Sequence, residues 1–129
     1  MTATTLLWVR RTMLAVFATF LLVASIGPKL VHAKVATDSL TGLGWGPQSV
    51  TLLGLIELGC LVVFLVPRTR LVGAVLMTAF LGGTVATHLR VGSPILSHTL
   101  FGVYLGLLMW GAVLLQDPDL RRILQPRAR

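Results

Sequence analysis

The chain has 129 residues, a length that suits one domain and is short for two. Hydrophobic residues make up 55% of it and charged residues 12%, against roughly 25% charged residues in a soluble domain, and the mean hydropathy is +0.88. This composition excludes an ordinary soluble domain, because it leaves too little polar surface to cover a fold in water. It predicts an integral membrane protein.

Four apolar segments follow one another along the chain, at residues 12–31, 49–66, 71–89 and 97–115. Each has 18 to 20 residues, close to the ~20 that cross ~30 Å of hydrocarbon as a helix. The four-residue connection 67–70 forces the second and third segments into an antiparallel hairpin, and the next connection is also short. The sequence therefore predicts a single transmembrane domain over residues 1–129, all-α, folded as an up-down-up-down four-helix bundle.

The basic residues predict the orientation of this bundle. The net charge of +7 does not indicate nucleic-acid binding, because the charges flank apolar segments and form no basic stripe. One side holds Arg10, Arg11, Arg68, Arg70, Arg121, Arg122, Arg127 and Arg129, and the other holds Lys29, Lys34 and Arg90. The positive-inside rule then places both termini in the cytoplasm. A cleaved signal peptide is the competing interpretation of the first segment, because an arginine pair, an apolar stretch and "VHA" follow in that order.

Two further residue types bear on packing and chemistry. The single cysteine, Cys60, excludes an internal disulfide and a CxxC redox pair, and it offers no metal-ligand spacing. Small residues are expected where membrane helices touch, either within one chain or between the chains of a homo-oligomer. The glycines predicted to mark such contacts are Gly54, Gly59, Gly73, Gly82, Gly83, Gly102 and Gly106.

A carboxylate, Glu57, stands inside the apolar stretch "LGLIELGCLVVFL". It lies about eight residues into its segment, so ~12 Å deep at 1.5 Å per residue. An unpartnered carboxylate at that depth costs roughly 2.5 kcal/mol or more. We therefore expect Glu57 to point into the bundle, with a polar group of Lys29, Thr84 or His88 within hydrogen-bond reach or one water away. If Lys29 pairs directly, Glu57 is ionised; if Lys29 extends to the headgroups, Glu57 is neutral.

Other polar residues are expected at a similar depth in the outer half of the bundle. Lys29 follows Pro28 at the end of the first segment, His88 and Thr84 lie one turn apart on the third, and His98 begins the fourth. The predicted site has Glu57, Lys29 and His88 as its reacting groups, and Thr84, His98, Tyr104 and Arg90 as its ligand-binding groups. No metal site is predicted, although two histidines at similar depth leave a haem or metal as an alternative.

Several stretches together resemble the DoxX-like family, over residues 11–124. They are "ASIGPKL" in the first segment, "LGLIELGCLVVFL" in the second, "PRTRLVGAVLMTAFLGGTVATHLRVG" through the third and "DPDLR" near the C-terminus. The resemblance implies a four-span protein of the bacterial cytoplasmic (inner) membrane. It also implies a link to respiratory quinone chemistry, as a small subunit of quinol oxidase or thiosulfate:quinone oxidoreductase assemblies, or to membrane oxidoreductase complexes in oxidative-stress defence. Lys29, Glu57 and His88 lie in the matching motifs.

Three functions from different classes remain open at this point. The first is an auxiliary subunit of a membrane redox system that binds a quinone or a lipid-like molecule, with any other cofactor supplied by partner subunits, because the sequence has no flavin or dinucleotide fingerprint. The second is a stand-alone enzyme that transfers a proton on a hydrophobic substrate, with Glu57 as the base. The third is a purely structural membrane subunit. Transport is disfavoured, because four spans without an internal repeat make a poor monomeric transporter.

Overall fold

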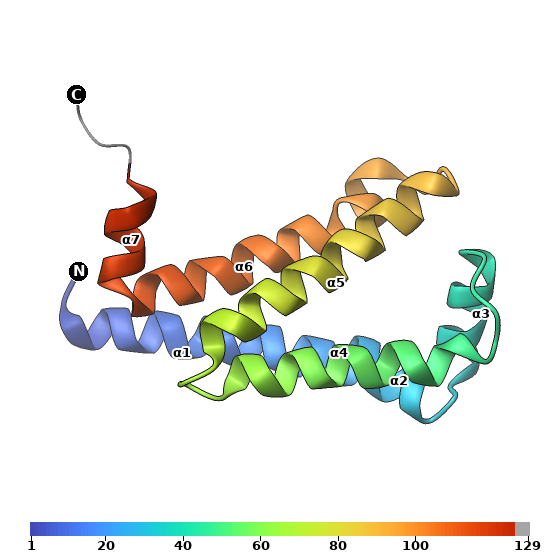
Figure 1. Ribbon diagram of the computed structural model, residues 1–129, viewed down its shortest axis with the longest axis horizontal. Helices are drawn as coiled ribbons and strands as arrows, with labels where there is room; N and C mark the ends of the chain where they lie inside the picture. The colour runs from blue at the N-terminus through green and yellow to red at the C-terminus, as the bar shows by residue number, and fades with distance from the viewer. Residues whose placement is uncertain (126–129) are drawn as a thin grey trace.

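The computed structural model describes residues 1–125, and every regular element in that range is helical (Figure 1). The first 28-residue helix consists of three parts, α1 (Ala3–Phe20), the π-helical stretch η1 (Leu21–Ile26) and α2 (Gly27–Leu30). The elements that follow are α3 (Lys34–Gly42), α4 (Ser49–Leu65), α5 (Arg70–Arg90), the π-helical η2 (Ile95–Thr99), α6 (Phe101–Gln116) and α7 (Pro118–Leu124).

Three of these helical runs are long and apolar enough to cross a membrane, namely Ala3–Leu30, Arg70–Arg90 and Ile95–Gln116. The remaining apolar helix, α4 (Ser49–Leu65), is shorter than these three and has 17 residues. The predicted segments therefore all fall on helices. The helix that contains the first segment extends beyond it. It begins nine residues before position 12, at Ala3, where the side chain of the capping residue Thr2 accepts the N–H of Thr5.

The π-helical stretch η1 lies directly before Gly27 and Pro28. Proline has no N–H to donate to the carbonyl four residues earlier, and its ring crowds that carbonyl. A locally wider turn accommodates both effects, and π-helical turns inside α-helices recur at functional sites. The sequence therefore favours a wider turn in the part of the first helix that carries Ser25, just before Lys29.

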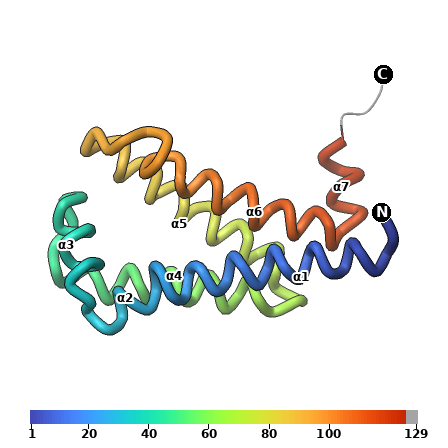
Figure 2. Tube along the Cα trace, turned by 180° about the vertical axis from the view of Figure 1, so that it is seen from behind, coloured from blue at the N-terminus to red at the C-terminus, as the bar shows by residue number. Residues whose placement is uncertain are grey.

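The helices pack in two layers (Figures 1 and 2). Contacts join α4 to α5, α5 to α6 and α6 to α1, while η1 and α2 lie against α4. The core is most compact toward the end that carries both termini, where the rings of Phe17 and Phe64 meet edge to face at 5.5 Å around buried Met77 and Met109. Toward the α3 end, the α5–α6 layer diverges from the α1–α4 layer in both views.

Only some of the predicted glycine contacts are present. A Cβ at Gly73 would overlap the backbone of Phe64, and one at Gly54 would lie 2.9 Å from the Cβ of Lys29. Gly59, Gly82 and Gly83 have no neighbouring atom within 4 Å of such a Cβ. These last three glycines therefore mark no helix contact within the chain. Contacts between chains at these positions stay a prediction.

Changing Gly73 to alanine is therefore expected to lower the free energy of unfolding by about 2 kcal/mol, since α5 must move away from α4 to make room for the methyl group. The matched change Gly82→Ala meets open space and is expected to stabilise the helix by up to about 1 kcal/mol. Thermal unfolding of both variants in one detergent measures the difference. Equal midpoints would contradict the close approach at Gly73.

Candidate functional site

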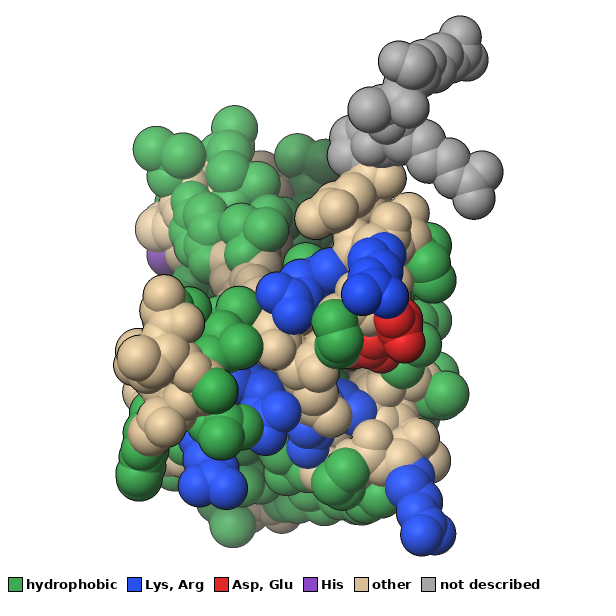
Figure 3. Space-filling model, turned by 90° about the vertical axis from the view of Figure 1, so that its left-hand side faces the viewer, with side chains coloured by type: hydrophobic (Ala, Val, Ile, Leu, Met, Phe, Trp, Pro, Cys, Tyr) green, Lys and Arg blue, Asp and Glu red, His purple; other side chains and the backbone are tan. Residues whose placement is uncertain are grey.

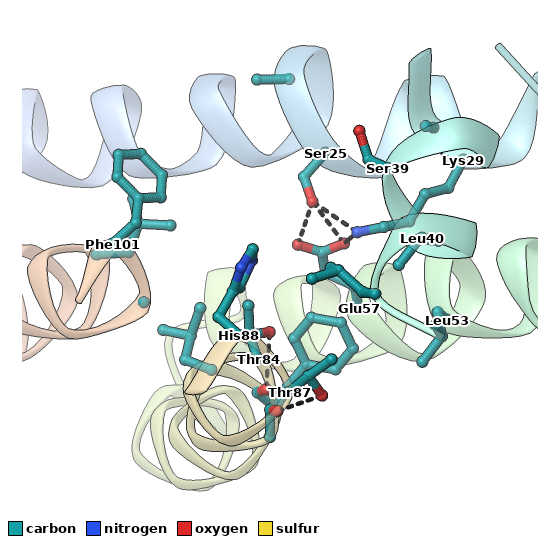
Figure 4. A pocket seen from close by; sticks show the side chains of 18 of the residues that line it. Ser25, Lys29, Ser39, Leu40, Leu53, Glu57, Thr84, Thr87, His88 and Phe101 are labelled. Carbon is teal, nitrogen blue, oxygen red and sulfur yellow. Dashed lines mark hydrogen bonds and ion pairs between the residues drawn. The ribbon is translucent and has the colours of Figure 1, made fainter. Parts of the chain in front are cut away.

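Glu57 is paired with Lys29 inside the protein (Figure 4). Lys29 Nζ lies 2.6 Å from Glu57 Oε2, and the side chains of Lys29 and Glu57 are 13% and 2% exposed. The predicted contact between these two residues is therefore confirmed. Lys29 turns inward and contacts Glu57 directly, without extending to the headgroups. The α2 segment and the middle of α4 supply the two side chains, and the close approach at Gly54 brings these helices together.

Ser25 joins the pair, and the sequence analysis missed it. Its hydroxyl lies 2.8 Å and 2.9 Å from the two Glu57 oxygens, and Lys29 Nζ donates to Ser25 Oγ at 2.7 Å. The signal that could have found it is the i, i+4 spacing of Ser25 and Lys29, which puts them on one helix face. The three residues form a hydrogen-bonded triad, called the Ser25–Lys29–Glu57 triad below.

The triad does not use all of its hydrogen-bonding capacity. The serine hydroxyl has one hydrogen to share between both carboxylate oxygens, so Oε1 keeps acceptor capacity. The ammonium group of Lys29 has three N–H donors and uses two within the triad. Its nitrogen also lies 5.7 Å from the centroid of the Phe80 ring. A molecule beside the triad can therefore both donate to Glu57 and accept from Lys29.

A second polar group comes from α5 and η2. The Nδ1 atom of His88 lies 3.0 Å from Ser93 Oγ, and the Nδ1 atom of His98 lies 2.8 Å from Ser97 Oγ. The two rings contact each other edge to face, with centroids 6.0 Å apart. Within residues 1–125, Nε2 of each ring has no hydrogen-bond partner. Thr84 donates to the carbonyl of Phe80, so it is not bonded to Glu57.

A cavity of about 750 Å³ lies between these two polar groups. The triad lines one wall, and Thr84, Thr87, His88 and His98 line another (Figure 4). The remaining walls are mostly apolar. Residues of α3 and of the segment after it, up to Trp45, cover the cavity at the α3 end of the molecule. The residues in that cover are Val35, Ala36, Ser39, Leu40, Leu43 and Trp45. Volume, apolar walls and a few convergent polar groups are typical of small-molecule sites.

The comparison with known protein families shows which family the chain belongs to. The model of the DoxX-like family matches residues 12–112. The chain belongs to the DoxX-like family. The matched range runs from α1 into α6 and contains every residue of the triad and of the histidine pair. No curated protein and no solved structure matches the chain.

Two predicted site residues of this DoxX-like protein lie elsewhere. Tyr104 donates to the carbonyl of Leu96 at 2.9 Å on an exposed face of α6, and Arg90 donates to the carbonyl of Leu43 at 2.8 Å. Neither lines the cavity. Both were predicted as ligand-binding groups, and the structure places both outside the cavity wall, because depth along the membrane determines the height of a side chain and not the direction in which it points. Arg90 instead ties the segment after α3 to the end of α5.

Within residues 1–125 no group of three or more His, Cys, Asp or Glu side chains is arranged to hold a metal ion. Cys60 lies on α4 as a free, half-buried thiol. His88 and His98 both line the cavity.

Proposed function

We propose that this DoxX-like protein crosses the bacterial cytoplasmic membrane four times as an up-down-up-down bundle, with both termini in the cytoplasm. The apolar α4 would be the fourth span, since 17 residues extend ~25 Å and approach the hydrocarbon thickness. Figure 3 supports the orientation, because Lys and Arg side chains gather at the end that carries α7 and the α4–α5 connection. Arg127 and Arg129, which were counted among the basic residues of the same side, lie outside the described residues.

We further propose that the cavity binds a membrane-soluble molecule whose ring carries carbonyl or hydroxyl oxygens, with a quinone as the best candidate. The observation that carries this proposal is the Ser25–Lys29–Glu57 triad on the wall of a 750 Å³ cavity. Lys29 would donate to a carbonyl oxygen, and Glu57 Oε1 would accept from a hydroxyl. The apolar walls suit a ring and the start of an isoprenoid tail. The protein would then act as an auxiliary subunit whose redox partner supplies the electron carriers.

Trp45 offers a direct test, because it lines the cavity whereas Trp8 and Trp110 do not. Adding a short-chain quinone to the purified protein is expected to quench tryptophan fluorescence saturably, with one quinone per chain. In Trp45→Phe the saturable part of the quenching is expected to disappear. Non-saturable quenching, or the same saturable quenching in Trp45→Phe, would contradict binding in this cavity.

A stand-alone proton-transfer enzyme is the second candidate. It is favoured by one observation: Glu57 and His88 approach the same cavity from different walls, so a substrate between them meets a carboxylate and an imidazole together. In that case Glu57 would accept a proton from a carbon or oxygen of the substrate while His88 polarises or protonates a second position. A hydrophobic substrate turned over by the protein without any partner subunit would favour this candidate over the auxiliary subunit.

A further inference from the structure

The end of the molecule opposite the α3 cover has an excess of positive charge (Figure 3). Its arginines are Arg10, Arg11, Arg68, Arg70, Arg121 and Arg122. The two acids at this end are engaged elsewhere. Asp117 accepts the backbone N–H groups of Asp119 and Leu120 at the start of α7, and Asp119 pairs with Arg122 at 3.3 Å. Among residues 1–125, no carboxylate pairs with any of the other five arginines.

Two of these arginines are partly buried. Arg70 donates to the carbonyls of Phe64 and Leu65 at 3.2 Å each and to Gln116 Oε1. Those carbonyls belong to the last turn of α4, where a helix leaves them without partners, so Arg70 has a clear structural role. Arg10 has none of this kind, because its Nε is buried and has no hydrogen-bond partner within residues 1–125.

The side chains of Arg10 and Arg70 both lie near the last turn of α6. The helices α1 and α6 run antiparallel in both views, and a Cβ at Gly111 would lie 2.7 Å from Cε of Met13. Arg10 precedes Met13 by one turn, so it faces the last turn of α6, where Gln116 accepts from Arg70. Two guanidinium groups and one side-chain amide therefore converge at the junction of α1, α5 and α6.

Like charges held together and partly removed from water are unfavourable unless an anion joins them. A phosphate group suits this arrangement, because its oxygens accept several guanidinium hydrogen bonds at once. Arg70 begins and Gln116 ends a helical run long enough to span a membrane, so the junction lies at the level of the headgroups. We propose that Arg10 and Arg70, with the amide of Gln116, bind the phosphate group of an anionic phospholipid.

The test compares lipids on the full-length protein in a neutral detergent. Phosphatidylglycerol is expected to raise the unfolding temperature more than the zwitterionic phosphatidylcholine does, and native mass spectrometry is expected to show one tightly held phosphatidylglycerol. Arg10→Gln is expected to weaken that binding at least tenfold. Arg10→Lys keeps the positive charge but lacks the planar guanidinium group, and its binding is expected to lie between those of the wild type and Arg10→Gln. The matched control is Arg11→Gln, which removes the same charge from the exposed neighbouring position and is expected to bind like the wild type.

Three results would overturn the proposal. Equal stabilisation by both lipids would show that the junction does not select an anion. Equal weakening in Arg10→Gln and Arg11→Gln would reduce the effect to diffuse attraction at a basic surface. Equal stabilisation by millimolar inorganic phosphate alone would show a site for free phosphate and not for a lipid headgroup. Because native mass spectrometry counts bound lipid on the folded protein, a lower stability of Arg10→Gln does not obscure the outcome.

Discussion

Replacing Lys29 by methionine is expected to lower the free energy of unfolding by about 3–5 kcal/mol. The change leaves the carboxylate of Glu57, which is 2% exposed, without its ammonium partner, and it also removes the donor to Ser25. A buried charge without compensation is among the largest single-residue penalties known. Equilibrium unfolding in mixed micelles, followed by circular dichroism, measures the loss.

Two control variants distinguish a structural role of the Lys29–Glu57 pair from a role in ligand binding. Lys34→Met breaks the exposed pair with Asp38, whose side chains are 89% and 61% exposed, and should cost less than about 1 kcal/mol. The double variant Lys29→Met, Glu57→Leu removes both buried charges and is expected to recover most of the stability, because buried pairs exchange for apolar residues at little cost. The double variant is also expected to lose ligand binding. If it binds quinone as the wild type does, the pair is a structural tie and the proposed site is wrong.

Changing Gly83 to leucine is expected to abolish ligand binding, with at least a hundredfold rise in Kd and little change in stability. Gly83 lines the cavity, and a Cβ built there has no neighbour within 4 Å, so the new side chain extends into free space. Leucine also favours a helix by about 1 kcal/mol over glycine, which supports the fold of the variant. The quinone titration with Trp45 fluorescence provides the measurement.

The neighbouring Gly82 supplies the matched control for this prediction. A Cβ at Gly82 also meets open space, but the residue does not line the cavity. Gly82→Leu is therefore expected to bind ligand normally while adding the same apolar volume to the same helix. Loss of binding in both variants would point to a general effect on α5, and retained binding in both would place the ligand somewhere else.

The sequence determined the elements of this protein and the depth of its polar groups. Apolar runs of 17 to 28 residues form helices in a chain with so few charges, and each predicted segment falls on one. Glu57 was recognisable as a candidate site residue because a carboxylate in such a run must find a partner, and few cations lie at its height. Lys29 was one of these, and the pair is present.

Which way each side chain points was decided only by tertiary structure. A residue's height follows from its position along a helix, whereas its direction depends on how the helices rotate and pack. Tyr104 and Arg90 are therefore at a suitable height but bond elsewhere, and Ser25 enters the site through a π-helical stretch beside Pro28. The cavity likewise depends on the divergence of two helical layers and on α3 covering it, which are long-range features that local sequence patterns do not encode.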